Sequence, residues 1–147
     1  MPETLKLRIT DGKDLSVASA LMQDCVVAAV DMAFDATARR FALIGNRYRH
    51  EAAPGLFSRL VGAKGERVRT GLHLNDVTAA TTKNIALGDP DAVGALLAID
   101  AQAIDEAFEI VLTFAGGSSV RLKADCIDGI MSDLSEPWPA GARPNHD

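Results

Sequence analysis

The sequence predicts a single α+β domain that is dominated by an antiparallel β-sheet and carries one or two short helices. Three observations support this fold class. Among the 147 residues, 48% are hydrophobic and 24% are charged, which is the composition of an ordinary globular domain. Stretches in which apolar and polar residues alternate recur along the chain, separated by turns that contain Gly, Asp and Asn. One stretch of helical periodicity interrupts them near the N-terminus.

The first third of the chain predicts a strand, a helix and two further strands. Residues 5–9 alternate in hydrophobicity and predict a half-buried strand. Apolar residues at helical spacing predict a short amphipathic helix over 15–23, with Asp14 as its N-cap. Residues 26–34 and 40–49 are rich in apolar side chains and predict two strands, the second of which leaves the core midway.

The middle of the chain predicts a long loop followed by a hairpin. Residues 51–65 have breakers at both ends and predict the loop. Residues 66–74 alternate strictly and predict a strand, which a turn at Asn75–Asp76 joins to a Thr-rich strand over 77–85. One face of the first strand carries Val68, Thr70, Leu72 and Leu74, and the other carries Arg67, Arg69, Gly71 and His73.

The last third predicts more strands, with two segments left open. Residues 96–101 fit a strand or part of a helix, whereas residues 108–114 and the segment from Val120 form a predicted hairpin around Gly116–Gly117. Residues 125–134 fit either a helix capped by an aspartate or one face of a strand.

The chain divides into a single domain over residues 1–135 and a Pro-rich C-terminal tail over residues 136–147. Within the domain, residues 68–77 resemble residues 120–127 at a shift of fifty positions. A duplicated antiparallel meander would give this pattern, and so would the general similarity of short alternating strands.

Charge is distributed unevenly along the chain. The net charge is −5, which argues against general nucleic-acid binding. Residues 39–83 nevertheless hold nine Lys and Arg against three Asp and Glu, a net charge of +6, whereas the remainder holds six against seventeen, a net charge of −11. This asymmetry fits either a local positive field that attracts anions or a set of charges that only solvates the surface.

A cluster of cations is the one candidate binding site. Arg47 and Arg49 lie two residues apart and share a face if their strand continues. Arg67, Arg69 and His73 share a face by the same period, so neighbouring strands would bring all five side chains to one surface. Guanidinium groups bind carboxylates and phosphates. Tyr48, on the opposite face, is then expected in the core.

The sequence lacks the common signatures of catalysis. It contains no Walker or dinucleotide-binding loop, no nucleophile elbow and no His or Cys spacing typical of a metal site, so we expect no cofactor, no metal and no recognisable catalytic residue. Cys25 and Cys126 each adjoin apolar residues, which predicts small buried side chains. Two cysteines and no signal sequence indicate a cytoplasmic protein.

Two classes of function fit these features. The first is a non-enzymatic binding or protein-interaction module, including self-association through a sheet edge or face. The second is an enzyme or sensor that binds a small anionic ligand through the arginine cluster. RNA binding through the basic middle ranks below both, and a membrane partner is not expected because no apolar stretch is long enough to span a bilayer.

Almost the whole chain resembles one family. The segments that carry the resemblance are LKLRITDGKDLSVASALMQDC, RRFAL with Asn46-Arg47-Tyr48, FAGGSSVRL, Cys126-Ile127-Asp128, Asp133-Leu134 and Pro137-Trp138. In this order they resemble the small alphaproteobacterial family labelled domain of unknown function 2948. The resemblance implies a soluble bacterial protein and assigns no activity, so it places no role on any residue.

Overall fold

In the computed structural model of the protein, the described residues are 4–48, 66–135 and 138–139. The predicted loop over 51–65 and most of the predicted tail lie outside them. The elements in chain order are β1 (Lys6–Ile9), α1 (Gly12–Leu21), β2 (Val26–Asp35), β3 (Arg40–Tyr48), β4 (Glu66–Leu74), β5 (Val77–Lys83), β6 (Val93–Ile104), β7 (Ala107–Phe114), β8 (Ser119–Ala124), β9 (Gly129–Asp133) and β10 (Trp138–Pro139). The predicted class, a sheet-dominated α+β fold, is confirmed.

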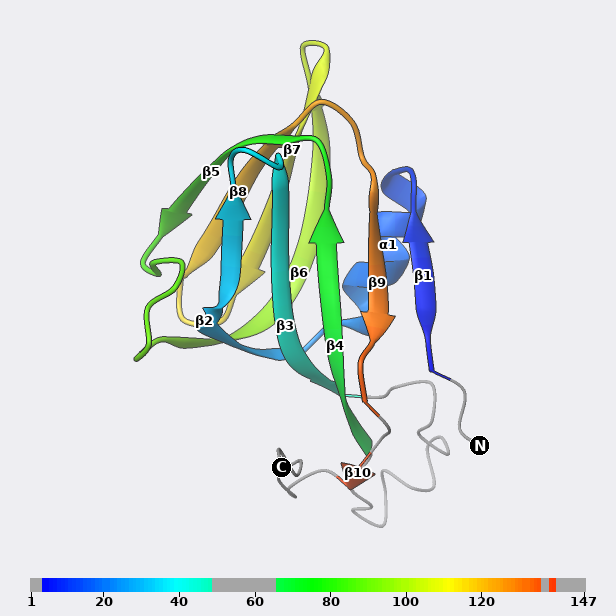
Figure 1. Cartoon of the computed structure of the whole chain (residues 1–147), viewed down its shortest axis with the longest axis vertical. Helices are drawn as coiled ribbons and strands as arrows, with labels where there is room; N and C mark the ends of the chain where they lie inside the picture. The colour runs from blue at the N-terminus through cyan, green and yellow to red at the C-terminus, as the bar shows by residue number, and fades with distance from the viewer. Residues whose placement is uncertain (1–3, 49–65, 136–137, 140–147) are drawn as a thin grey trace.

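The strands form one antiparallel sheet that folds over on itself. Their order is β1-β9-β4-β3-β2-β6-β7-β8-β5, and β10 pairs with β4. Strands β2 and β6 pair over only Val26–Ala28, and beyond this point the sheet divides into two facing layers (Figure 1). The front layer in that view contains β1, β9, β4, β3 and β2, and the rear layer contains β6, β7, β8 and β5. We call the sides that face each other inner and the opposite sides outer.

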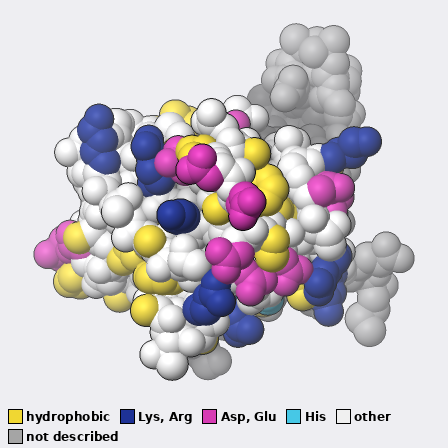
Figure 2. All heavy atoms as spheres, turned by 90° about the horizontal axis from the view of Figure 1, so that it is seen from above, with side chains coloured by type: hydrophobic (Ala, Val, Ile, Leu, Met, Phe, Trp, Pro, Cys, Tyr) yellow, Lys and Arg dark blue, Asp and Glu magenta, His cyan; other side chains and the backbone are white. Residues whose placement is uncertain are grey.

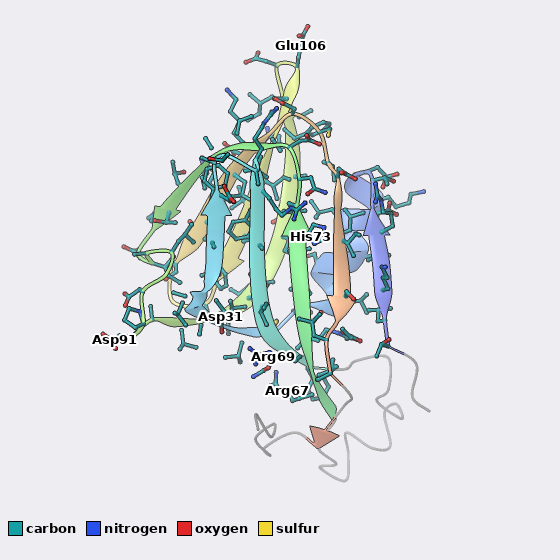
Figure 3. All side chains as sticks on the ribbon, viewed as in Figure 1. Asp31, Arg67, Arg69, His73, Asp91 and Glu106 are labelled. Carbon is teal, nitrogen blue, oxygen red and sulfur yellow. The ribbon has the colours of Figure 1, made fainter. Side chains whose placement is uncertain are left out.

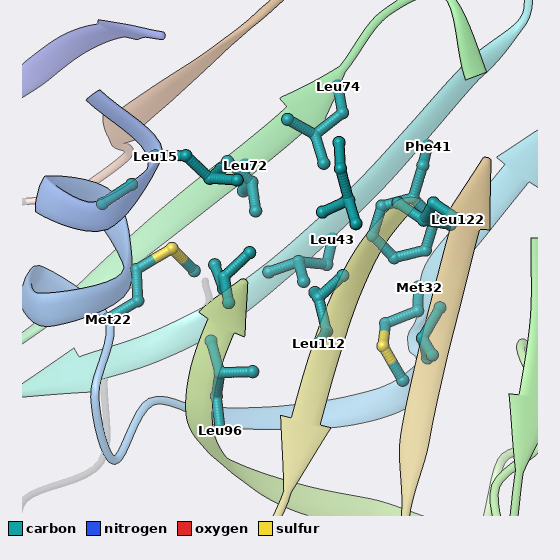
Figure 4. Packing of buried hydrophobic residues seen from close by; sticks show 14 of the residues in the cluster. Leu15, Met22, Met32, Phe41, Leu43, Leu72, Leu74, Leu96, Leu112 and Leu122 are labelled. Atoms are coloured by element: carbon teal, nitrogen blue, oxygen red, sulfur yellow. The ribbon is translucent and has the colours of Figure 1, made fainter. Parts of the chain in front are cut away.

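The core lies between the inner faces of the two layers. Phe41 and Leu43 of β3 are buried together with Leu112 of β7 and Leu122 of β8 (Figure 4). Helix α1 contacts β1 and β6 and directs Leu15 and other apolar side chains into the same core. The layers and the helix therefore bury one continuous set of apolar side chains, which is the main source of stability in a domain of this size.

Helix α1 begins earlier than the sequence predicts. Its N-cap is Asp11, whose side chain accepts a hydrogen bond from the Asp14 backbone nitrogen at 2.8 Å. The prediction of Asp14 as the cap is wrong, because its carboxylate lies in the first turn and accepts from both the backbone nitrogen and the hydroxyl of Thr10 at 3.0 Å. A carboxylate in a first turn also favours the helix electrostatically. No helix in the described ranges is long and apolar enough to cross a membrane.

Both segments that the sequence left open form strands. Residues 96–101 belong to the longer strand β6. Within residues 125–134, a turn leads to β9, which pairs with β1 on one side and β4 on the other. Gly129 permits the close approach of β9 to β4, because a Cβ at this position would lie 2.2 Å from the backbone oxygen of His73.

Two connections between the layers contact each other at their turns. One leads from β4 in the front layer to β5 in the rear layer, and the other leads from β8 back to β9. Because β4 and β5 pair with other strands and not with each other, the predicted hairpin over 66–85 is wrong. The backbone nitrogen of Asn75 donates to the oxygen of Asp128 at 2.8 Å, and that of Asp125 donates to the oxygen of Asp76 at 2.9 Å. The strand order from β9 to β5 is symmetric about its centre. On one side of the centre lie β2, β3, β4 and β9, and on the other side lie β6, β7, β8 and β5 in the corresponding positions. A duplicated meander would give this order, and the duplication stays a prediction, as does the domain boundary at residue 135.

Candidate functional site

Arg47 lies on the inner face of β3 and is completely buried, with 0% of its surface exposed. Its register partner on β4 is the core residue Val68. The guanidinium donates two hydrogen bonds to Asp133 of β9, from Nε to Oδ1 at 2.9 Å and from Nη2 to Oδ2 at 2.8 Å. The prediction that Arg47 shares a surface with Arg67 and Arg69 is therefore wrong.

The alternation of β3 explains this orientation. Phe41, Leu43 and Gly45 point inward, so Arg47 follows them at the same period. Tyr48 accordingly lies on the outer face, where it is half-buried, and the prediction that it belongs to the core is also wrong. Arg49 lies outside the described residues.

The Arg47–Asp133 pair is structural in character. The Asp133 side chain is only 4% exposed, and Oδ2 also accepts a hydrogen bond from the backbone nitrogen of Leu5 at 3.2 Å. Burying two charges is costly, and paired geometry with additional hydrogen bonds offsets that cost. Because the Arg47 guanidinium has no exposed surface, it cannot contact a ligand from solvent.

Arg67 and Arg69 lie on the outer face of β4 near its N-terminal end (Figure 3). The Arg67 Nη1 atom donates to the backbone oxygens of Asp24 and Asn46 at 3.3 and 3.4 Å. Its guanidinium carbon also lies 5.6 Å from the centre of the Tyr48 ring, within the range of a cation–π contact. These contacts fix the direction of the Arg67 side chain without neutralising its charge.

Arg69 lies at the next outer position of β4, about 7 Å along the strand. The register places Val26, Asn46 and Arg69 side by side on three neighbouring strands. Leu134 completes this row, because its backbone nitrogen donates to the Arg69 oxygen at 2.7 Å. Within the described part of the chain, neither Arg67 nor Arg69 has a carboxylate partner.

We call this surface the β4 patch and define it as Val26, Asn46, Arg67, Arg69 and Leu134. Val26 is 38% exposed and Leu134 is 53% exposed, so apolar surface flanks the cations. The Asn46 Oδ1 atom is buried and accepts no hydrogen bond from the residues described. Buried acceptors rarely stay unpaired in proteins. The accessible surface of the patch therefore combines exposed apolar side chains with positive charge that no described carboxylate neutralises.

His73 shares the outer face of β4 but is separated from the two arginines. Gly71 lies between them, and a Cβ at Gly71 would be 3.3 Å from a methyl carbon of Leu134. The Leu134 side chain thus covers the gap between Arg69 and His73. Of the four predicted site residues that the structure describes, it brings together Arg67 and Arg69 and separates Arg47 and His73 from them.

The surroundings of His73 form a second charged group. Partial burial lowers the pKa of His73 from its ordinary value, and the nearby positive charges of Arg40 and Arg8 lower this pKa further, while the charge of Asp128 opposes them. Arg8 Nη2 lies 2.8 Å from Asp128 Oδ1, and Arg40 Nε donates to Asn75 Oδ1 at 3.0 Å. These two arginines have polar side chains as partners, whereas Arg67 of the β4 patch donates to backbone oxygens.

The two cysteines lie in different environments. Cys25 is buried, as predicted, and burial raises the pKa of its thiol to about 12 despite the charges of Arg67 and Arg47. Cys126 is exposed, so its prediction as a buried residue is wrong. Its sulfur lies 3.2 Å from Asp76 Oδ2, and this hydrogen bond raises the pKa of the Cys126 thiol. A raised pKa keeps a thiol protonated and unreactive near neutral pH.

Sequence reasoning missed the partners of the two arginines. Val26, Asn46 and Leu134 come from three separate segments, and only the sheet register brings them beside Arg69. Asn46 is next to Arg47 in the sequence and could have been assigned to the outer face by counting from Phe41. Among the residues described, no group of three or more His, Cys, Asp or Glu side chains is placed to hold a metal ion.

Comparison with known proteins identifies a family and no activity. Neither the curated proteins nor the solved structures include a match to the chain. The family model described as protein of unknown function (DUF2948) matches residues 5–146, which is almost the complete sequence. The chain therefore belongs to the DUF2948 family.

Proposed function

We propose that this protein is a non-enzymatic binding module that recognises an acidic segment of a partner protein through the β4 patch. One observation carries the proposal: Arg67 and Arg69 present two guanidinium groups on the same outer face, and no described carboxylate neutralises either of them. Arginine forks bind carboxylates with directed, charge-assisted hydrogen bonds.

The neighbours of the two arginines favour a polypeptide over a bare anion. Val26 and Leu134 flank Arg69 with exposed apolar surface, which a partner side chain would bury favourably. Arginine within a partly apolar patch is also typical of interaction surfaces.

A small anionic ligand, bound by an enzyme or a sensor, is the second candidate. The spacing of about 7 Å between Arg67 and Arg69 would let both contact one phosphate or dicarboxylate. The orientation of Arg47 weakens this candidate. Its guanidinium is paired with Asp133 on the inner face and cannot contact a ligand that is bound by Arg67 and Arg69.

Fluorescence anisotropy with a labelled peptide of alternating Glu and Leu tests the proposal. We expect wild-type protein to bind this peptide, with affinity that falls as salt is added because the contacts are ionic. The variant R67E/R69E should lose at least about tenfold in affinity, since each charge-assisted hydrogen bond contributes more than about 1.4 kcal/mol.

The matched control is K13E/K83E, which makes the same change of charge at two exposed lysines of α1 and β5 that lie outside the β4 patch. It should bind the peptide as wild type does. Equal losses in both variants would mean general charge attraction and would overturn the proposal. Binding of inorganic phosphate or citrate by the same arginines, without binding of the peptide, would favour the small-anion candidate instead.

A further inference from the structure

The β6–β7 hairpin extends beyond the core as a projecting arm. From Asp100 to Ile104, every residue of β6 is exposed, and the returning strand starts after a two-residue turn at Asp105–Glu106. Figure 1 shows this hairpin rising above the rest of the sheet, and Figure 3 labels Glu106 at its tip. An isolated two-stranded ribbon is only marginally stable in water, so contacts at the arm would stabilise it.

The arm exposes apolar side chains as well as acidic ones. Ile104 is 42% exposed, and its register partner Ala107 lies beside it on the same face. Asp105 and Glu106 form the turn between them. An exposed branched side chain next to two carboxylates is buried favourably against apolar groups flanked by cations.

A groove of about 730 Å³ lies beside the arm, on the outer face of the rear layer. The arm forms one side of it, and β5 and β8 form the other. The register explains the hollow: the small side chains of Ala79 and Thr81 lie opposite the long side chains of Lys123 and Arg121. The groove is thus open above β5 and bordered by two cations.

The two sides of the groove carry opposite charges. Asp105, Glu106 and Glu109 of the hairpin are acidic, whereas Arg121 and Lys123 of β8 are basic. Asp125, which follows β8, also lines the groove, and its carboxylate is paired with Arg39. Among the described residues, a loose ion pair connects the sides, with Arg121 Nη1 3.7 Å from Glu109 Oε2. Viewed from the end where the arm projects, acidic and basic side chains lie interspersed with apolar surface (Figure 2). A two-fold symmetric interface uses the same surface on both subunits, so that surface must carry both the acidic and the basic groups that pair with each other.

We propose that two copies of the chain form a two-fold symmetric dimer in which the β6–β7 arm of each copy lies in the groove of the other. Asp105 and Glu106 of one copy then meet Arg121 and Lys123 of the second, and Ile104 packs over the small β5 side chains. The proposal is independent of the proposed function, because the groove and the β4 patch lie on the outer faces of different layers.

Sedimentation velocity on the full chain tests the dimer with two charge-reversal variants. Wild type should sediment as a dimer. D105K/E106K places cations against the basic side of the groove, and R121E/K123E places acids against the acidic arm, so each variant alone should sediment as a monomer. Mixed in equal amounts, the two variants should form a heterodimer, because both arm–groove contacts are then between opposite charges.

The mixing step separates a specific contact from a folding defect, because a misfolded variant would not restore the dimer. R67E/R69E is the control and should remain dimeric. A monomeric wild type at the highest soluble concentration, a dimer that persists in both charge-reversal variants, or a mixture that stays monomeric would each overturn the proposal. Failure of the peptide-binding experiment would leave this result unchanged.

Discussion

Arginines on the inner and outer faces of the β3–β4 strand pair differ in burial and in their partners. On the inner face, Arg47 is buried and held by Asp133 through two hydrogen bonds. On the outer face, Arg67 contacts backbone oxygens and the ring of Tyr48. Arg69, beside it, has no described side-chain partner. The difference shows that the direction of a side chain relative to the core decides whether its charge stabilises the fold or stays available for a ligand.

Breaking the inner pair should have the largest effect. Asp133→Asn would leave the Arg47 charge buried without its counter-charge, which costs about 3–5 kcal/mol of unfolding free energy. Urea denaturation followed by circular dichroism measures this loss. Asp128→Asn, which affects the more exposed partner of Arg8, should cost less than about 1 kcal/mol. Similar losses in the two variants would contradict the contrast between the faces.

Replacing the unsatisfied acceptor of the β4 patch should have a smaller effect of the opposite sign. Asn46→Val removes a buried oxygen that lacks a donor and adds a β-branched side chain beside Val26 on a neighbouring strand. We expect stability to stay constant or to rise by up to about 1 kcal/mol, because the removed oxygen accepts no described hydrogen bond. A marked loss of stability in thermal denaturation would show that Asn46 serves the fold instead.

The smallest effect concerns pH. Because the pKa of His73 in the folded state lies below its ordinary value of 6.5, the unfolded chain binds this proton more tightly than the folded chain does. The stability contribution of His73 is therefore complete above about pH 6.5 and is lost as the pH falls through the folded-state pKa. His73→Gln should flatten the decline of the melting temperature between neutral and mildly acidic pH. An unchanged slope would show that other groups dominate.

The sequence was sufficient for the fold class and for most strands, because alternation of apolar and polar residues is a local signal. The strict alternation of residues 66–74 predicted both faces of β4 correctly, including the outward direction of Arg67 and Arg69. For β3, the apolar start of the strand hid the same period, and Arg47 and Tyr48 were assigned to the wrong faces.

The set of residues that forms the β4 patch could not be predicted from the sequence, for a different reason. Its members lie on strands that are neighbours only in the folded sheet, where β3 separates β2 from β4 and β9 follows β4. Pairing of strands distant in sequence depends on the whole topology and not on any local pattern. The groove likewise depends on the pairing of β5 with β8, which links residues about forty positions apart.

The central claim is that Arg67 and Arg69 are available for binding because no described carboxylate neutralises their charges. The most direct test measures, for R67A/R69A against wild type, both the unfolding free energy and the affinity for the Glu–Leu peptide. The account predicts that stability falls by no more than about 2 kcal/mol, because both side chains are half-buried and the variant loses the long hydrogen bonds and the ring contact of Arg67, while the affinity falls at least about tenfold. Unfolding as severe as that of Asp133→Asn, or unchanged affinity for the peptide, would contradict it.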